Sequence, residues 1–219
     1  MEENKYQIPL IGDIAPNFKT QTTHGEVNFP EDYKGKWVVL FSHPGDFTPV
    51  CTTEFIAFQN QKSEFDKRNT QLIGYSMDGL ASHIAWVRNI KEKFNVTIDF
   101  PIATGMDIAF KYGMIHKNSS TSATIRAVFV ISPGGVIAAL IYYPLTNGRS
   151  IKEILRLLDS LQISYNQQRS TPAEWPNNEL YKDKVIIPPP ATTKAAENII
   201  EKGLFTNDWY ICTEDPTEN

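Results

Sequence analysis

The chain of 219 residues contains two cysteines, Cys51 and Cys212. A cysteine thiolate is a strong nucleophile, and two cysteines in a reducing compartment seldom form a structural disulfide. The two residues are therefore either apolar fillers, or at least one of them is kept for its chemistry.

Cys51 ends a segment, His43 to Cys51, that lies between a predicted strand and a predicted helix. The strand is the apolar run Trp37–Ser42, which stops at a His-Pro-Gly breaker, and the helix is predicted over Thr52–Lys67. Cys51 is thus expected at or just inside the first helical turn. Free backbone N–H groups and the positive end of the helix dipole favour a thiolate there.

A helix terminus alone is not expected to ionise a thiol fully. An ordinary thiol has a pKa of about 8.5, and lowering it to about 6 requires ~3.4 kcal/mol. A helix N-terminus typically supplies ~0.3–1 kcal/mol, or ~2 kcal/mol when it is partly buried. A nearby permanent cation is needed, and an arginine suits because it does not lose its proton.

Other chemistries fit the sequence less well. Cys51 is followed by Thr52, Thr53 and Glu54, so the Cys-x-x-Cys motif of a disulfide reductase is absent. The two cysteines and four histidines show no zinc-ligand spacing, and no metal or other cofactor is expected. A cysteine hydrolase using His43 has no further support in the sequence.

Pro44, Thr48 and Cys51 have the Pro-x-x-x-Thr-x-x-Cys spacing of the peroxiredoxins, and Ser42–Glu54 resembles the one-cysteine branch of that family in particular. The resemblance covers nearly the whole chain. Its other segments are Gly12–Phe18, Arg126–Ile131, Tyr143–Pro144, Gly148–Arg149, Glu153–Arg156, Thr171–Pro172 and Trp175.

The resemblance implies a thiol peroxidase that reduces hydrogen peroxide and organic hydroperoxides through a Cys51 sulfenic acid. In this scheme Arg126 stabilises the thiolate and binds the peroxide, Thr48 forms a hydrogen bond to the bound peroxide, and Pro44 shields the thiolate from water. The resemblance also implies Arg149 as a second cation, which lies behind the residues that contact the sulfur and the peroxide.

Two neighbours of this set have open roles. His43 either orients the loop through a hydrogen bond or only packs. Glu54 either joins a network with Arg126 or is only a favourable charge near the helix N-terminus.

The resemblance leaves regeneration of Cys51 open. An external thiol, from a thioredoxin-like protein or a small molecule, reduces the sulfenic acid in the one-cysteine branch. However, Asp208–Cys212 resembles the Asp-Trp-Trp-Phe-Cys segment of archaeal-type members, which implies that Cys212 of a partner subunit resolves Cys51. The family also forms homodimers and rings of dimers, so a holdase or peroxide-sensor role is the alternative to an enzyme.

A phospholipase function is not carried over from mammalian-type members. Pro30 and Lys36 stand where their histidine and serine are expected.

Strands and helices alternate in the first three quarters of the chain. Beyond the elements above, helices are predicted over Leu80–Phe94, Met106–Tyr112 and Ile151–Leu161, and strands over Gln71–Ser76, Phe100–Ala103, Arg126–Ser132 and Val136–Tyr143. This pattern predicts an α/β, thioredoxin-like fold with helices on both faces of a mixed sheet. We expect a peroxidase domain over residues 1–164.

Residues 165–219 are broken repeatedly by proline, with one short helix predicted over Thr192–Lys202. Their few apolar side chains need another surface to cover them. We expect an extended C-terminal dimerisation segment.

Composition excludes several partners. Hydrophobic residues make up 41% and charged residues 21% of the chain, and the net charge of −4 argues against nucleic-acid binding. The N-terminal residues 1–5 are acidic where a signal peptide is basic, and the apolar run Val136–Tyr143 is too short to cross a membrane. A cytoplasmic location is expected.

Overall fold

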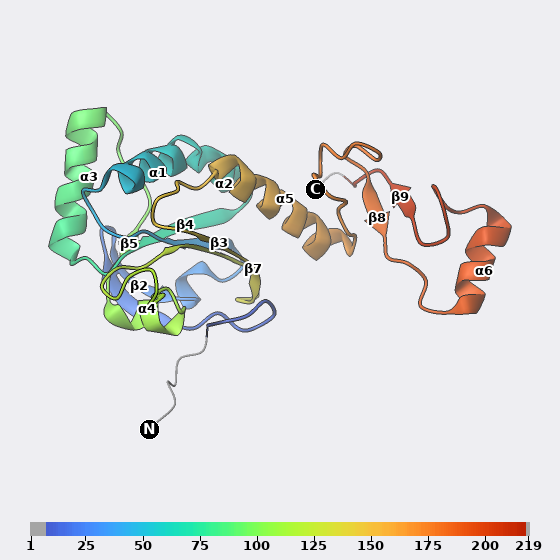
Figure 1. Cartoon of the computed structure of the whole chain (residues 1–219), viewed down its shortest axis with the longest axis horizontal. Helices are drawn as coiled ribbons and strands as arrows, with labels where there is room; N and C mark the ends of the chain where they lie inside the picture. The colour runs from blue at the N-terminus through green and yellow to red at the C-terminus, as the bar shows by residue number, and fades with distance from the viewer. Residues whose placement is uncertain (1–7, 218–219) are drawn as a thin grey trace, which may run out of the picture. The chain divides into compact units, whose positions relative to one another are not determined.

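The computed structural model describes residues 8–217, and it divides the chain into two compact units between Ile151 and Lys152 (Figure 1). The N-terminal residues on which the signal-peptide argument depended lie outside the described part. None of the helices described is long and apolar enough to span a membrane.

A seven-stranded mixed sheet forms the centre of the first unit. Its strands are β1 (Phe18–Thr22), β2 (Gly25–Phe29), β3 (Trp37–Ser42), β4 (Thr70–Tyr75), β5 (Ile102–Ala103), β6 (Arg126–Ile131) and β7 (Ile137–Tyr143). The spatial order is β2-β1-β5-β4-β3-β6-β7. β4 pairs in parallel with β3 and β5, and the other neighbours are antiparallel.

Both faces of this sheet are covered, as predicted. The helices of the first unit are the 3-10 helix η1 (Glu31–Tyr33) and the α-helices α1 (Pro49–Asn60), α2 (Lys62–Lys67), α3 (Leu80–Phe94) and α4 (Met106–Lys111). In Figure 1, α1 and α2 lie on one side of the sheet and α4 on the other.

All six residues of β3 are buried, and alternate side chains of the strand enter different cores. Leu40 belongs to the cluster that contains Ile108 of α4. Phe41 faces the other way and stacks on Phe58 of α1, with ring centroids 4.0 Å apart. β3 is therefore fixed from both sides, and its C-terminal end is a rigid place from which to start a site.

The second unit contains α5 (Ile151–Gln167), α6 (Thr193–Lys202) and a hairpin of β8 (Val185–Ile187) and β9 (Cys212–Glu214). Its small buried cluster consists of Ile163, Trp175 and Val185. α6 buries none of its residues within the described chain.

The structure differs from the predicted elements in one helix and two hairpins, and the helix predicted over Ile151–Leu161 extends to Gln167. The helix predicted over Thr52–Lys67 begins earlier, at Pro49, because proline suits the first helical position, and it is divided at Gln61 into α1 and α2. The hairpins β1–β2 and β8–β9 were not predicted. The strands β1 and β2 are short and rich in polar residues, and β8 and β9 have only three residues each, too few for a periodic pattern.

Candidate active site

The loop from β3 to α1 begins with His43, whose backbone is held on both sides. Its N–H donates to the Tyr75 carbonyl at 2.9 Å, and its carbonyl accepts the Thr124 hydroxyl at 2.8 Å. Pro44 follows and is half-buried. The first residues of the loop are thus continuous with the rigid end of the sheet.

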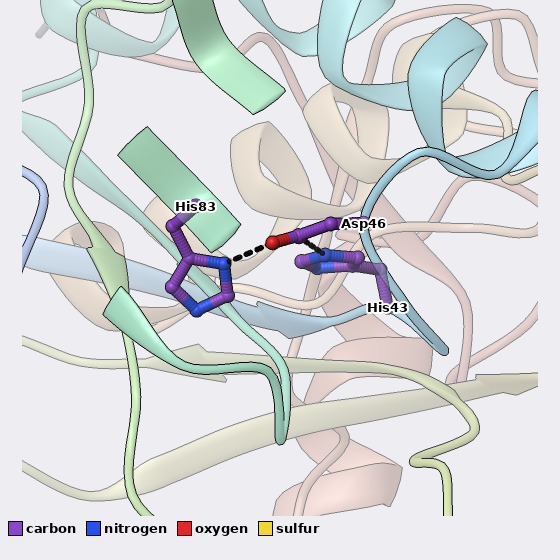
Figure 2. Close-up of side chains that lie close together, drawn as sticks. All are labelled: His43, Asp46 and His83. Atoms are coloured by element: carbon purple, nitrogen blue, oxygen red, sulfur yellow. Dashed lines mark hydrogen bonds and ion pairs between the residues drawn. The ribbon is translucent and has the colours of Figure 1, made fainter. Parts of the chain in front are cut away.

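Asp46 joins this loop to helix α3 through two imidazole rings (Figure 2). One carboxylate oxygen lies 2.9 Å from Nε2 of His43, and the other lies 2.8 Å from Nδ1 of His83. The side chains are almost completely buried. His43 therefore orients the loop by a hydrogen bond, which was one of the two roles left open by the sequence.

The ionisation of this group follows from its burial and contacts. Burial lowers the pKa of His43, because a charged imidazole loses its hydration there, and this outweighs the opposing effect of Asp46. Burial alone would raise the pKa of Asp46. The hydrogen bonds from His43 and His83 outweigh it and hold the pKa of that carboxyl well below its usual range.

His43, Asp46 and His83 could also hold a metal ion by residue type, since one ligand atom from each lies within 4.8 Å of the others. This grouping could not be predicted from the sequence, because His83 lies on a different element. Both carboxylate oxygens already face a ring nitrogen. Hydrogen bonding within the group thus accounts for its geometry.

Cys51 is the third residue of α1, within the first turn as predicted. Thr48 occupies the N-cap position with extended backbone angles, but its hydroxyl donates to the Gly45 carbonyl of the loop at 2.9 Å and does not cap the helix. The Cys51 side chain is fully buried. The thiol therefore lies at the positive end of the helix dipole, in an environment of low dielectric constant.

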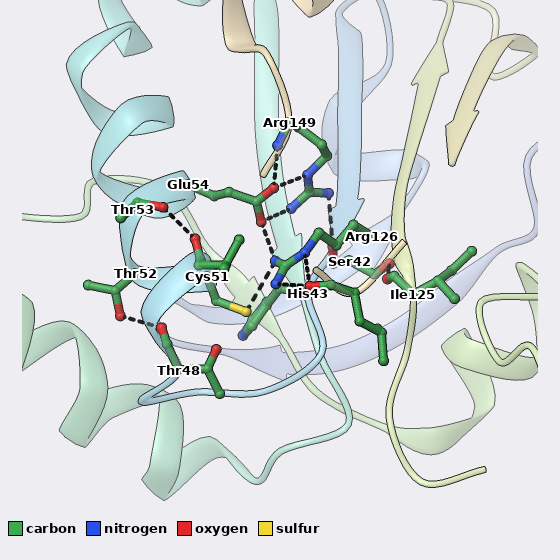
Figure 3. A network of polar contacts seen from close by, with 12 residues as sticks. Ser42, His43, Thr48, Cys51, Thr52, Thr53, Glu54, Ile125, Arg126 and Arg149 are labelled. Atoms are coloured by element: carbon green, nitrogen blue, oxygen red, sulfur yellow. Dashed lines mark hydrogen bonds and ion pairs between the residues drawn. The ribbon is translucent and has the colours of Figure 1, made fainter. Parts of the chain in front are cut away.

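Arg126, the first residue of β6, contacts the thiol directly (Figure 3). Its Nη1 lies 3.3 Å from the Cys51 sulfur and 2.6 Å from Oε2 of Glu54. Nε and Nη2 donate to the Leu145 carbonyl at 3.0 and 2.8 Å. These contacts fix the guanidinium in one orientation.

Arg149 binds the other side of Glu54. Its Nε and backbone N–H donate to Oε1 at 2.8 Å, and its Nη2 donates to Oε2 at 2.7 Å. Burial alone would raise the pKa of Glu54. The hydrogen bonds and charge of Arg149, with a smaller effect of Arg126, outweigh it and hold the pKa below its usual value. Glu54 is therefore a buried carboxylate shared by two arginines, which is the network role considered for it.

The structure thus brings together, within the first unit, the predicted residues His43, Glu54, Arg126 and Arg149 around Cys51 and the loop that carries Pro44 and Thr48. Cys212 lies in the second unit, where its sulfur donates to the Leu204 carbonyl at 3.1 Å. The sequence did not indicate Asp46, His83 or the Leu145 carbonyl. An aspartate three positions after a histidine in the same loop was the available sequence signal for Asp46.

Comparison with known proteins identifies the family. The AhpC/TSA family model matches residues 11–140. A peroxiredoxin of Aquifex aeolicus (strain VF5) is 54% identical over 213 residues, which cover 94% of this chain and 96% of the relative.

Solved structures agree with the sequence relatives. A mutant of peroxiredoxin 6 of Arenicola marina is 32% identical, with a TM-score of 0.81, over 96% of this chain and 99% of that one. A yeast mitochondrial 1-Cys peroxiredoxin, studied for its thiol resolving mechanism via glutathione/thioredoxin systems, is 38% identical with a TM-score of 0.79, over 94% of this chain and 100% of that one. These similarities confirm the predicted thioredoxin-like fold. The chain therefore belongs to the AhpC/TSA family and is a peroxiredoxin, a thiol-dependent peroxidase.

Proposed function

We propose that Cys51 is the residue that reduces the peroxide, and that hydrogen peroxide and organic hydroperoxides are both substrates. The 3.3 Å contact between Nη1 of Arg126 and the Cys51 sulfur carries this proposal. The thiolate sulfur attacks the terminal oxygen of ROOH, so that an S–O bond forms and the O–O bond breaks. Cys51 is oxidised to a sulfenic acid, and the alkoxide takes up a proton and leaves as ROH.

The charges around the sulfur suit a thiolate. Arg126 and Arg149 carry two positive charges, and Glu54 carries one negative charge, so the three side chains leave one net positive charge. A Cys51 thiolate brings the total to zero. Buried charges are tolerated when they are paired and hydrogen-bonded, and the thiolate completes such a set.

Thr48 and Pro44 are proposed to form the peroxide site beside the sulfur. The Thr48 hydroxyl uses its proton on Gly45, which leaves its oxygen free to accept a hydrogen bond from the O–H of the peroxide. Pro44 is half-buried and has no N–H, so it adds an apolar surface at the start of the loop.

Turnover with a generic dithiol tests the enzyme against the sensor. We expect the parent protein to consume many equivalents of peroxide and Cys51→Ser to consume none. Consumption of a single equivalent followed by arrest would instead support a sensor or holdase.

We further propose that the sulfenic acid is reduced either by Cys212 of a partner subunit or by an external thiol, as in the one-cysteine branch. Cys212 opens strand β9 and pairs with Ile187 of β8. A disulfide needs its two Cα atoms within about 7 Å, and Cys51 is fully buried, so we expect the Cys51 helix to unwind locally or the C-terminal segment to move.

Non-reducing gel electrophoresis after one equivalent of peroxide distinguishes the two routes. Resolution by Cys212 gives a covalent dimer that is absent in both Cys51→Ser and Cys212→Ser. Normal turnover of Cys212→Ser, with no dimer band from the parent protein, would make Cys212 a bystander and an external thiol the reductant.

Residues 165–219 are proposed to be a dimerisation arm that follows a peroxidase domain of residues 1–164. The arm exposes large apolar side chains that its own unit does not cover: Leu180, Ile200, Leu204, Phe205 and Tyr210. We propose a homodimer assembled into a ring of dimers. A monomer in sedimentation of the reduced protein at micromolar concentration would contradict it.

The two free thiols suit the cytoplasm, the compartment we propose.

A further inference from the structure

Helix α3 holds the loop before Cys51 through the side chain of Asp46. The carboxylate accepts from His43 at 2.9 Å and from His83 at 2.8 Å, and the Asp46 N–H donates to Asp78 at 3.0 Å. The exposed fraction is 0% for each histidine side chain and 1% for that of Asp46. Three hydrogen bonds of Asp46 thus fix the middle of the loop, and the one from His83 comes from α3.

The hydrogen bonds to Asp46 also decide which nitrogen of each ring carries a proton. A carboxylate only accepts, so Nε2 of His43 and Nδ1 of His83 must be the donors. Nδ1 of His43 and Nε2 of His83 are buried and have no hydrogen-bond partner within the described residues. Without Asp46, Nε2 of the buried His43 ring would lose its partner, and no hydrogen bond within the described residues would select this tautomer.

The same loop carries the residues that we propose for the peroxide site. Thr48 follows Asp46 by two positions and binds the loop at Gly45. The His43 ring packs edge-on against Phe55, one helical turn after Cys51, with ring centroids 4.7 Å apart. In Figure 3, His43 and Thr48 both reach towards Cys51 from the loop. A shift of Asp46 would therefore move groups on both sides of the sulfur.

We propose that His83 is a positioning residue of the peroxidase reaction, which acts through Asp46 on the loop that carries Pro44 and Thr48. This inference rests on the proposed role of Cys51. It assigns a role in the reaction to a side chain on α3, a helix that contributes no other residue to the proposed site.

Three variants separate positioning from packing. His83→Leu removes the donor to Asp46 and keeps an apolar side chain. His83→Asn keeps a donor, because its amide nitrogen takes the place of Nδ1, whereas the longer side chain of His83→Gln presents its nitrogen where Nε2 was. His24→Leu, at an exposed histidine in the β1–β2 turn, is the matched control.

Two rate constants are measured for each variant, with Cys212→Ser as the common background. One is the reaction of Cys51 with hydrogen peroxide, followed by tryptophan fluorescence, and the other is its alkylation by iodoacetamide, which needs the thiolate but not the peroxide site. A misplaced catalytic group costs up to ~100-fold, so we expect His83→Leu to slow the peroxide reaction by ~10–100-fold. Alkylation should change little. His83→Asn should react nearly as fast as the parent protein, and His24→Leu should be unchanged.

The inference is overturned if His83→Leu reacts with peroxide at the parental rate, or if it loses both reactions equally. Should His83→Leu not fold, the comparison of His83→Asn with His83→Gln decides, and equal peroxide rates for these two would overturn it. A parent protein whose Cys51 does not react with peroxide would instead refute the proposed function, so the two failures are distinguishable.

Discussion

Replacing Arg126 by alanine removes the cation that touches the Cys51 sulfur. Nη1 of Arg126 lies 3.3 Å from the Cys51 sulfur, and Arg126 is 2% exposed. Unit charges at this separation attract by about 5 kcal/mol when the effective dielectric constant is about 20. The same guanidinium nitrogen is 2.6 Å from Glu54, so part of its charge is already compensated. The net effect on the thiolate must therefore be smaller than this value.

The stabilisation that an ionised thiol requires gives a second estimate of the effect of Arg126. A thiol that is half ionised near pH 6 needs ~3.4 kcal/mol of preferential thiolate stabilisation, of which a helix N-terminus supplies ~0.3–2 kcal/mol. The remainder, ~1.4–3.1 kcal/mol, falls within the limit set by the Coulomb energy. It corresponds to a factor of ~10–200 in the ionisation constant of the thiol. We expect Arg126→Ala to lose that factor.

The assay uses Cys212→Ser as the background, so that Cys51 is the one thiol. The rate of alkylation by iodoacetamide and the ultraviolet absorbance of the thiolate are measured against pH. At pH 7, a change of this size lowers the thiolate fraction of a thiol that is half ionised near pH 6 by ~2–20-fold, so Arg126→Ala should be alkylated ~2–20-fold more slowly. The difference should vanish at alkaline pH, where the thiol ionises without help.

Arg68→Ala is the matched control, because Arg68 is bound to Glu64 on α2 and lies outside the site. Circular dichroism checks that the variant is folded, since the Leu145 carbonyl loses its two donors. If the thiolate absorbance of Arg126→Ala follows pH as in the parent protein, Arg126 does not stabilise the thiolate and the reasoning is refuted.

Two further predictions concern stability. Glu54→Gln leaves Arg126 and Arg149 as buried cations without a carboxylate, so its free energy of unfolding in urea should fall by ~3–5 kcal/mol; an unchanged value would contradict the network. The pKa values of Asp46 and Glu54 are lowered on folding, so their stabilisation is present above the ordinary carboxyl pKa of about 4 and is lost as pH falls further. The lowered pKa of His43 acts in a higher pH range than the carboxyl groups do. As pH falls below about 6.5, the unfolded chain takes up a proton on His43 before the folded protein does, so the free energy of unfolding falls. Urea titrations at a series of pH values should show both stages, and a free energy of unfolding that is constant from neutral pH down to about 4 would refute the assignment for His43.

Local sequence was sufficient to predict where Cys51 would lie. Strand β3 is a continuous apolar run, the breaker after it is strong, and the proline before Cys51 suits the start of a helix. Arg126 is different, because it is separated from Cys51 by 75 positions and belongs to another strand. A thiolate at Cys51 needs a nearby cation on electrostatic grounds, but only the family resemblance indicated that Arg126 supplies it.

The contact between Asp46 and His83 could not be predicted from the sequence, for a physical reason. They are 37 positions apart, and their contact exists because α3 packs against the loop after β3. Neither the helical period of α3 nor the turn residues of the loop specifies that packing. The hairpin β1–β2 was missed because Lys19, Gln21, Glu26 and Asn28 alternate with few apolar residues. Phe18, Val27 and Phe29 of this hairpin pack into the core of the first unit, and local sequence does not specify that packing.

Glu54 sets the net positive charge that the two arginines present to the Cys51 sulfur. Two guanidiniums without the carboxylate would hold the thiolate more strongly, but a more stabilised thiolate is also a weaker nucleophile. A neutral set of one arginine and one carboxylate would leave the thiolate as an uncompensated buried charge. With both arginines bound to Glu54, one net positive charge remains, and Arg126 delivers it at 3.3 Å from the sulfur. In the proposed mechanism, the two arginines favour the Cys51 thiolate, and the shared carboxylate limits how far they lower its nucleophilicity.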